Sequence, residues 1–575
     1  MLNPALPMPA TPDPVLEVDR PTEAPSRPID ALIALASAPS ATPAAPAAVG
    51  IGNVGSGDVA IGDGAPRPGA ATARREPRWV KVIDQSRCIG CHACTTACKS
   101  ENEVPVGVTR TYVKAVDIGA FPNARRAFQV TRCNQCSDAP CVTACPTAAM
   151  FKRGDGIVDF DKAACIGCKA CIAACPYDAI FINPEDHSAE KCNFCAHRID
   201  GGLEPACVVV CPTQAILVGD LHDPESAVNR IVNREPVAVR RPEKETRPGL
   251  FYKGAHQATL DPLAARRPRG DTFMWSEQGS GRQIVPAGHP GTWNSSAAAV
   301  LAYDVPHRAP WDWRVSLYTW TKGIAAGAYL VPLLLVLTGI ISPASVLWTW
   351  VAPVMGGAFL ALTGLLLLLD LEHPLRFLYI FLRPQPRSWL VRGAVLISGF
   401  GVILVLHFVA TVAGRGDLAL PLAIGGLPLA GLTAVYTAYL FAQAKARDLW
   451  QSPLLPPHLL VQAALAGSAV TLLAAAALEP AAVGALAAWL AGAAAAHLLL
   501  VAGEITLTHP TAHARLAAHE LFAGRFADFF WIGVVLVAGG LAAPILGPVA
   551  AIAALLGLLA HEHAYVQAGQ SVPLA

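Results

Sequence analysis

The sequence predicts an α+β ferredoxin-like double domain, with one ferredoxin unit inserted in another, followed by an all-α bundle of eight transmembrane helices. Two observations support this fold class. All 16 cysteines lie between Cys88 and Cys211, in tight groups. The chain after about residue 315 contains repeated apolar stretches, and 53% of all residues are hydrophobic, with a mean hydropathy of +0.42. Such values are typical of a chain that lies partly in lipid.

Changes in composition divide the 575 residues into four parts. Residues 1–77 are rich in Ala, Pro and Gly, which predicts a disordered N-terminal extension. Residues 78–220 carry the cysteines, residues 221–310 read as an extended connector, and residues 311–575 read as a membrane anchor. The first 30 residues lack a basic region followed by an apolar run, so we expect no secretion signal. The net charge of +1 gives no reason to expect a nucleic-acid partner.

The cysteines form four groups of four, and the spacing inside the groups is typical of iron–sulfur proteins. The third group, "CIGCKACIAACP" (165–176), has the spacing C-x2-C-x2-C-x3-C-P of bacterial ferredoxins. In that arrangement three cysteines hold one 4Fe-4S cluster and the fourth ligates another. Zinc ribbons instead use paired C-x2-C units separated by longer loops, and a disulfide framework would not come in such tight groups.

Chain order then predicts the ligands of four clusters. The second and third groups are adjacent and form one ferredoxin-like unit, while the first and fourth groups form a second unit around it. The predicted clusters are Cys88/Cys91/Cys94/Cys211, Cys98/Cys192/Cys195/Cys207, Cys133/Cys136/Cys141/Cys175 and Cys145/Cys165/Cys168/Cys171. Four clusters in a row transfer single electrons and perform no bond chemistry on a substrate.

Two long segments resemble a known family. They are "RCNQCSDAPCVTACPTAAMFKRGDGIVDFDKAACIGCKACIAACPYDAI" and "KCNFCAHRIDGGLEPACVVVCPTQAI". Both are similar to the four-cluster electron-transfer subunit of the DMSO reductase/polysulfide reductase family. This resemblance covers about residues 80–220. It implies a separate catalytic subunit that carries a molybdenum or tungsten bis-pterin cofactor and performs the substrate chemistry.

Apolar stretches long enough to cross a bilayer, at ~20 residues each, follow in the second half. The predicted spans are residues 316–341, 346–370, 389–413, 418–442, 459–478, 480–502, 529–546 and 547–567. Segments such as "GEITLTHPTAHARLAAHELFAGRFADFFWIG" (503–533) are similar to the polysulfide reductase membrane-anchor family. That resemblance implies an eight-helix protein, usually without haem, that exchanges electrons with quinone. The four-cluster electron-transfer subunit and the membrane-anchor subunit would be fused in this chain.

Ionisable residues gather at one level of the predicted bundle, on the side that carries the iron–sulfur region. Such residues are expensive in membrane spans and are often functional. The candidates for quinone binding are Lys322, Asp370, His373, Arg376, Tyr436 and Glu504. We expect no haem, because the depths of His407 and His497 differ by roughly 18 Å at ~1.5 Å per residue. A packed core residue is the simpler interpretation of His407.

The sequence thus predicts an integral inner-membrane protein that passes electrons between a catalytic partner and membrane quinone or quinol through four 4Fe-4S clusters. Arginine and lysine are concentrated on the iron–sulfur side, and Arg415 stands alone on the other side. The positive-inside rule then places the clusters in the cytoplasm, with the periplasm as the alternative. Two other functions stay open: a redox-coupled proton-translocating module that uses Asp370, Glu504 and His407, and a zinc-stabilised membrane scaffold.

Overall fold

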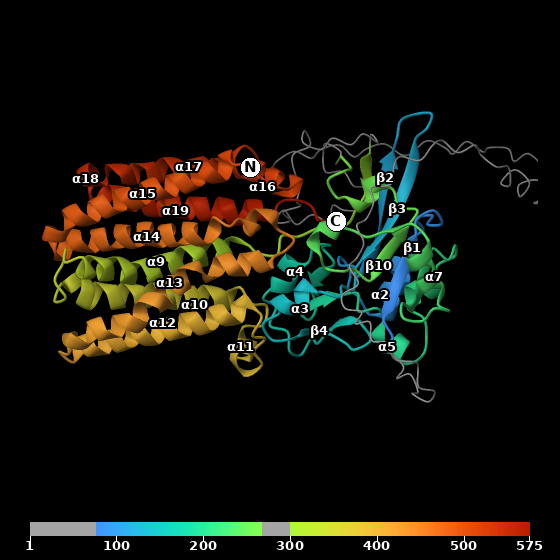
Figure 1. Ribbon diagram of the computed structural model, residues 1–575, viewed down its shortest axis with the longest axis horizontal. Helices are drawn as coiled ribbons and strands as arrows, with labels where there is room; N and C mark the ends of the chain where they lie inside the picture. Colours follow the sequence, from blue (N-terminus) through green and yellow to red (C-terminus); the bar gives the residue numbers. More distant parts are fainter. Residues whose placement is uncertain (1–75, 267–298, 575) are drawn as a thin grey trace, which may run out of the picture. The chain divides into compact units, whose positions relative to one another are not determined.

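The structure is a computed structural model that describes residues 76–266 and 299–574 (Figure 1). These residues belong to one compact unit, Arg74–Ala575. The expected disordered extension, residues 1–77, lies outside the described residues apart from its last two positions. The predicted fold class is confirmed: a ferredoxin-like region of short strands and helices precedes a region of long apolar helices.

The largest sheet closes the outer ferredoxin unit. Its strand order is β8-β1-β10-β9, with β1 at Trp79–Asp84, β8 at Ile216–Asp220, β10 at Leu250–Lys253 and β9 at Val237–Ala238. β1 and β8 are antiparallel, and Ile83 pairs with Ile216. Strands from the two ends of the cysteine region therefore lie side by side, which brings the first and fourth cysteine groups together.

Three smaller sheets complete the region. A three-stranded sheet contains β11 (Val300–Tyr303), β2 (Thr111–Ile118) and β3 (Arg125–Arg132) in that order. Two hairpins flank the third cysteine group: β4 (Met150–Lys152) pairs with β5 (Val158–Phe160), and β6 (Ile180–Ile182) pairs with β7 (Ala189–Lys191).

Short helices follow the cysteine groups, and others link the strands. The helices of this region are α2 (Ala93–Glu101), α3 (Pro140–Ala144), α4 (Ala170–Ala174), α5 (Ala196–Asp200), α6 (Ala206–Val209), α7 (Ala227–Arg234) and α8 (Gln257–Leu260). Each of α2, α3, α4 and α6 contains a cysteine in its first two residues, so a helix start orients one thiol of every group.

Part of the segment expected as an extended connector, residues 221–310, takes regular structure. β10 pairs in parallel with β1, and β11 pairs with β2. The strand sequences "LFYK" and "VLAY" are four residues long, too short to show a clear period of two among the surrounding Pro, Arg and Gly. Residues 267–298 of this segment lie outside the described residues.

Eight helices in the described part of the chain are long and apolar enough to cross a membrane, which confirms the predicted number. They span Trp313–Leu337, Leu347–Leu369, Trp389–Val412, Gly416–Gln443, Leu455–Leu478, Pro480–Thr506, Ala527–Leu546 and Pro548–Gly569. Their main helices are α9 (Trp313–Leu337), α10 (Ala352–Leu369), α12 (Trp389–Val412), α13 (Ala419–Gln443), α14 (Leu455–Leu478), α15 (Val483–Thr506), α17 (Ala527–Gly539) with α18 (Ala543–Leu546), and α19 (Pro548–Gly569). The short helices α11 (Tyr379–Leu382) and α16 (Ala512–Phe522) lie in the loops between spans.

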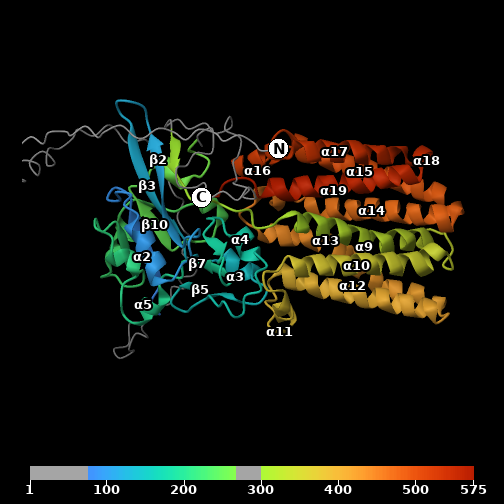
Figure 2. The ribbon, with the colours of Figure 1, turned by 180° about the vertical axis from the view of Figure 1, so that it is seen from behind.

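The helices differ in how much of their surface faces other protein. In α9, 83% of the most apolar 18-residue stretch is buried inside the protein, whereas in α12 the buried share of such a stretch is 22%. Figures 1 and 2 show α9 in the middle of the bundle and α12 at its edge, from both sides. At one contact the backbones of α9 and α14 touch, since a Cβ at Gly327 would lie 1.9 Å from the Ala463 carbonyl oxygen. Such small-residue contacts let membrane helices approach closely. The polar side chains of Thr321 and Lys322 in α9 are buried.

Candidate iron–sulfur sites and the membrane site

Three cavities in the ferredoxin-like region are each lined by four cysteines. Their linings include Cys88, Cys91, Cys94 and Cys211 in the first, Cys133, Cys136, Cys141 and Cys175 in the second, and Cys145, Cys165, Cys168 and Cys171 in the third. In every case the structure brings together the four cysteines of one predicted set. Each set takes three cysteines from one group and the fourth from its partner group, as ferredoxin ligation requires.

The remaining four cysteines also lie together. Cys98 interacts electrostatically with Cys192, Cys195 and Cys207. The amide nitrogen of Asn102 lies 3.7 Å from the Sγ atoms of both Cys98 and Cys195, so one side chain touches two members of the set. These 16 thiols are therefore arranged as four sets of four, and all are free of disulfides.

The backbone of the cysteine loops points amide groups toward sulfur. His92 and Lys169 occupy corresponding positions in two loops, with φ angles of 59° and 61° in the left-handed region. Backbone N–H groups donate to cysteine sulfur from Gly167 to Cys165 at 3.4 Å and from Ala215 to Cys211 at 3.2 Å. Hydrogen bonds to sulfur and burial tune the potential of an iron–sulfur cluster. The loops are therefore shaped to stabilise negatively charged sulfur.

Buried cations surround Cys207. Arg132 donates from its guanidinium to Cys207 Sγ at 2.9 Å, and the Lys81 ammonium lies 3.9 Å from the same sulfur. Burial alone would raise the pKa of the Cys207 thiol, but Arg132 and Lys81 lower it to about 7. For Cys94 burial dominates and raises the pKa to about 11. Most of these buried thiols therefore need the positive charge of a metal cluster to exist as thiolates.

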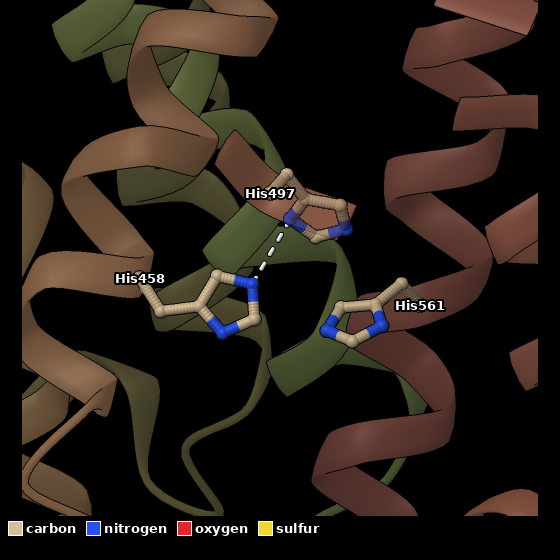
Figure 3. Close-up of side chains that lie close together, drawn as sticks. All are labelled: His458, His497 and His561. Atoms are coloured by element: carbon tan, nitrogen blue, oxygen red, sulfur yellow. Dashed lines mark hydrogen bonds between the residues drawn. The ribbon is translucent and has the colours of Figure 1, made fainter. Parts of the chain in front are cut away.

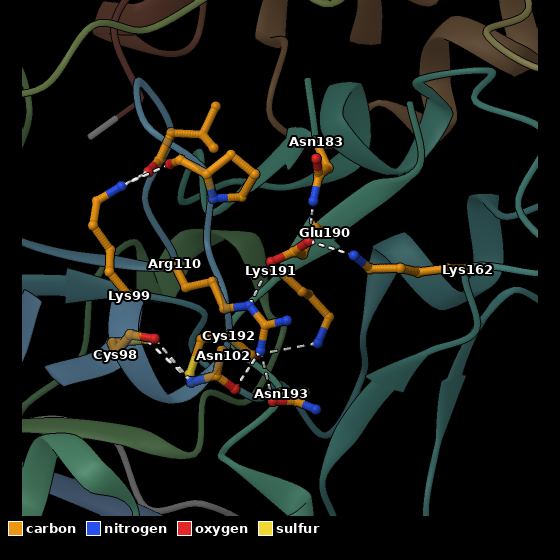
Figure 4. Close-up of polar contacts among 12 residues, drawn as sticks. Cys98, Lys99, Asn102, Arg110, Lys162, Asn183, Glu190, Lys191, Cys192 and Asn193 are labelled. Atoms are coloured by element: carbon orange, nitrogen blue, oxygen red, sulfur yellow. Dashed lines mark hydrogen bonds and ion pairs between the residues drawn. The ribbon is translucent and has the colours of Figure 1, made fainter. Parts of the chain in front are cut away.

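A polar network lies beside the Cys98 set (Figure 4). Arg110 donates from Nε to Glu190 at 2.7 Å and from Nη1 to Asn102 at 2.7 Å. Lys162 binds the second oxygen of Glu190 at 2.9 Å. Burial works against the ionised Glu190, yet Lys162 and Arg110 lower the pKa of its carboxyl. Since Asn102 contacts both Cys98 and Cys195, this network fixes the surroundings of the Cys98 set.

Neighbouring sets pack together, since Cys94 and Cys207 lie in one hydrophobic cluster and Cys133 and Cys192 lie in another. Cys94 of the Cys88 set interacts with Cys207 of the Cys98 set. Cys133 interacts with Cys192, which places the Cys133 set next. Cys171 interacts with Cys141, which places the Cys145 set last. The four sets therefore form a row that begins with the Cys88 set and ends with the Cys145 set.

The last set of the row lies against the loop after α10. Lys169 forms ion pairs with Asp370 at 3.4 Å and Glu372 at 3.1 Å. Burial opposes the charged Lys169 ammonium, but the two carboxylates outweigh burial and raise its pKa. Arg376 donates to the Cys165 carbonyl at 2.9 Å, and the His373 N–H donates to the Ile166 carbonyl at 3.2 Å. Trp311, just before α9, donates from its indole to the Cys168 carbonyl at 3.3 Å. This loop therefore positions the Cys145 set.

The six predicted quinone residues thus divide into two groups. Asp370, His373 and Arg376 lie against residues 162–169, as described above. Lys322, Tyr436 and Glu504 are buried among the helices. Lys322 donates to the Ala434 carbonyl at 2.8 Å and to Thr437 Oγ1 at 2.7 Å, and its ammonium lies 5.0 Å from the Tyr436 ring centroid. Lys322 and Tyr436 therefore offer polar groups at one buried place, whereas Glu504 pairs with His458 at 3.2 Å.

A cluster of three histidines is not evident from the sequence. His458, His497 and His561 come from α14, α15 and α19, and all are buried (Figure 3). The predicted fifth span begins at residue 459, so it leaves His458 in the preceding loop. The sequence-based comparison of depths in the membrane considered His497 only together with His407. The observed helices end at Thr506 and Gly569, so His497 and His561 lie nearly equally far from the ends of α15 and α19. More accurate predicted ends for these two helices would have shown that His497 and His561 lie at the same depth in the membrane.

His407 lies apart from these groups. Its ring centroid is 4.6 Å from that of Trp348 and 5.9 Å from that of Tyr329, and neither ring nitrogen has a hydrogen-bond partner. These aromatic contacts are those of a packed core residue.

Three family models match the chain. A "4Fe-4S binding domain" matches residues 79–100, a "4Fe-4S dicluster domain" matches residues 125–221, and "Polysulphide reductase, NrfD" matches residues 304–572. An iron–sulfur region and an NrfD-type membrane region therefore occur together in this chain.

Curated relatives match the iron–sulfur region. A tetrathionate reductase subunit of Salmonella typhimurium is 41% identical over 204 residues, which cover 35% of this chain and 80% of the relative. A polysulfide reductase chain of Wolinella succinogenes is 43% identical over 177 residues, 30% of this chain and 93% of the relative. A putative dimethyl sulfoxide reductase iron-sulfur subunit of Halobacterium salinarum is 40% identical over 216 residues, 32% of this chain and 82% of the relative.

Proposed function

The protein belongs to the family of iron–sulfur subunits that includes these relatives from tetrathionate reductase and polysulfide reductase, and from this premise we propose how it moves electrons. Its membrane region is of the NrfD type, so it is an electron-transfer protein with its own membrane anchor. The proposal is that four 4Fe-4S clusters form a continuous path between a catalytic partner and membrane quinone.

The observation that carries this proposal is the arrangement of the 16 cysteines as four sets in a row. Each set would hold one cluster, with the ligands Cys88/Cys91/Cys94/Cys211, Cys98/Cys192/Cys195/Cys207, Cys133/Cys136/Cys141/Cys175 and Cys145/Cys165/Cys168/Cys171. When bound, the clusters supply one-electron chemistry. The chain's own residues hold them, exclude water and tune their potentials through groups such as Arg132.

Quinone or quinol would exchange electrons at the end of the row that faces the bundle. We assign the headgroup site to Lys322 and Tyr436, and Glu562 links it to Glu504 through electrostatic interactions with both Lys322 and Glu504. Lys322 also interacts electrostatically with Glu562 of α19, which can hold a proton close to the headgroup. Asp370, His373 and Arg376 would position the Cys145 cluster instead of touching quinone.

The catalytic partner would dock at the other end of the row. Cys91 is exposed there, and apolar side chains next to two ligands are more than half exposed: Ile89 at 58% and Val209 at 59%. Exposed apolar groups beside a cluster fit a protein interface at which electrons cross. We propose a separate catalytic subunit with a molybdenum or tungsten bis-pterin cofactor, as the sequence resemblance implies.

The clusters would face the cytoplasm. Exposed cationic side chains in the loops, the short helix α16 and the first turn of α12 on the iron–sulfur side are Arg383, Arg387, Arg392, Lys445, Arg515 and Arg525. On the opposite side Arg415 forms an ion pair with Asp417 at 3.0 Å. The positive-inside rule counts such loop charges and favours a cytoplasmic iron–sulfur region. A reporter fused after Gln570 tests this orientation, because alkaline phosphatase is active there only if that side is periplasmic.

The quinone site is tested by mixing the purified, cluster-loaded chain with a menaquinol analogue under anaerobic conditions. We expect the clusters to be reduced, and Lys322→Met to slow the reduction by at least tenfold, since it removes a charged donor from a buried site. Lys445→Met is the matched control, because Lys445 is exposed in a loop on the same side. Equal rates in the two variants would contradict the assignment of Lys322.

A further inference from the structure

Three imidazoles meet inside the bundle, and the proposed electron path gives them no role. His458, His497 and His561 each have a relative exposure of 1%. One ring nitrogen of each lies within 4.8 Å of the others. The ring centroids are 4.8, 5.4 and 4.9 Å apart. Figure 3 shows that the three rings converge from three different helices.

Glu504 orients one of these rings. Its Oε1 lies 3.2 Å from His458 Nδ1, while the other nitrogen of His458, Nε2, lies 2.9 Å from His497 Nδ1. If His458 donates to Glu504 from Nδ1, its Nε2 is left as an acceptor that faces the other two histidines. Histidines that ligate metals almost always donate their second ring N–H to a carboxylate or carbonyl. The Glu504–His458 pair has this arrangement.

His561 provides an independent observation. Neither of its ring nitrogens has a hydrogen-bond partner, although the residue is buried. An imidazole without partners in a bundle loses the hydrogen bonds that water would provide, and this loss is unfavourable. A hydrogen-bonded His458–His497 pair leaves both ring nitrogens of His561 without a partner, whereas an ion bound by all three rings gives one of them a partner.

We propose that His458, His497 and His561 form a binding site for one divalent first-row transition-metal ion such as Zn²⁺. Neutral imidazole nitrogen is a ligand that zinc, copper, nickel and iron all accept. Three histidines with an open fourth position form a known type of zinc site. Glu504 supplies negative charge beside the ion and fixes the tautomer of His458. Haem does not fit, because rings at these centroid distances leave no space for a macrocycle between them.

The three ligands are distinct from the 16 cluster cysteines, although Glu504, which pairs with His458, is also named beside the proposed quinone site. All three ligands lie in membrane-spanning helices. Removal of the ion therefore leaves the 16 cluster ligands unchanged, so cluster content reports folding separately from metal binding.

The test uses the full chain, purified anaerobically with its clusters, equilibrated with Zn²⁺ and then dialysed. We expect elemental analysis to give about one zinc per chain. X-ray absorption at the zinc edge should show nitrogen ligands at about 2.0–2.1 Å and no sulfur at ~2.3 Å. The variants His497→Ala and His561→Ala should each lose this zinc while the cluster absorbance near 400 nm is retained.

Two further variants make the test specific. Glu504→Gln keeps all three ligands and should weaken zinc binding by about 10- to 100-fold. His407→Ala is the matched control, since His407 is also a buried membrane histidine without hydrogen-bond partners and should keep the zinc. Wild-type protein without stoichiometric zinc, zinc bound through sulfur, or unchanged zinc in His561→Ala would each overturn the proposal.

Discussion

Arg132 illustrates how one side chain can set the properties of a cluster. It is almost fully buried, and its guanidinium bonds Cys207 Sγ at 2.9 Å. Reduction adds negative charge to a cluster, so a fixed cation bonded to a ligand sulfur favours the reduced form. The cluster of the Cys98 set should therefore have a higher potential than it would without Arg132.

Arg132→Gln should lower the midpoint potential of that cluster. We expect a decrease on the order of 60 mV, the one-electron equivalent of about 1.4 kcal/mol. Redox titration followed by electron paramagnetic resonance measures it. Arg126→Gln is the control, because Arg126 lies on the same strand but pairs with Asp117 at the surface. A potential that does not change in Arg132→Gln would contradict the role of this cation.

His307 lies between two carboxylates at the start of the membrane region. Its Nδ1 pairs with Asp178, close to the Cys175 ligand, and its Nε2 lies 3.1 Å from Asp304. Burial alone would lower its pKa, but Asp304 and Asp178 raise it from 6.5 to about 9. A raised histidine pKa stabilises the folded state fully below pH 6.5, and this stabilisation is lost as the pH rises through 9.

The stability of the chain should therefore fall between about pH 7 and pH 9.5, and His307→Gln should remove most of this dependence. The contribution of a single group is on the order of 3 kcal/mol at most. Thermal unfolding of cluster-loaded protein in detergent across this pH range measures it. If the stability of His307→Gln falls with pH as steeply as that of the wild type, groups other than His307 cause the pH dependence.

At the scale of structural elements, the cluster loop around Gly167 and the loop after α10 fit closely. Gly167 has a φ of +70°, and a Cβ there would lie 2.4 Å from Cβ of Glu372. Glycine is therefore required at position 167 for two reasons: its positive φ and the close approach of Glu372. The ion pairs of Lys169 with Asp370 and Glu372 lie beside this contact.

Gly167→Ala should push these loops apart and slow quinol-driven reduction of the clusters. Gly202→Ala is a matched control, because Gly202 has a φ of +71° but no atoms within 4 Å of the added Cβ. Both variants should lose about 1–2 kcal/mol of stability, because alanine is strained at a left-handed φ. Only Gly167→Ala should slow electron transfer, which stopped-flow absorbance measures; equal slowing in both would contradict the importance of this contact.

The elements also show which features are readable from sequence. Eight apolar stretches predicted the eight spans within a few residues, because lipid requires long continuous apolar helices. Cysteine spacing predicted which thiols come together. β10 and β11 were missed because four-residue strands carry almost no periodic signal.

Side-chain partners depend on tertiary contacts that no local pattern records. Asp370, His373 and Arg376 were grouped with Lys322 by depth, yet they contact the Cys145 loop. The convergence of His458, His497 and His561 depends on how three helices pack together, so their spacing along the sequence does not reveal it.

At the scale of the whole molecule, the alternative function of redox-coupled proton translocation would require a titratable path across the bundle. His407 packs between aromatic rings, so it is not expected to carry protons. His407→Gln in proteoliposomes should leave the number of protons released per electron unchanged. A clear decrease in that ratio, at unchanged electron-transfer rate, would instead support translocation through His407.

The central claim is that one chain holds four 4Fe-4S clusters that exchange electrons with quinone. Iron and acid-labile sulfide analysis of the anaerobically reconstituted protein, combined with Mössbauer spectroscopy, tests it most directly. We expect about 16 irons per chain, all in cubane clusters with four cysteine ligands each. Stoichiometric zinc at the cysteines, or far fewer irons than 16, would contradict it.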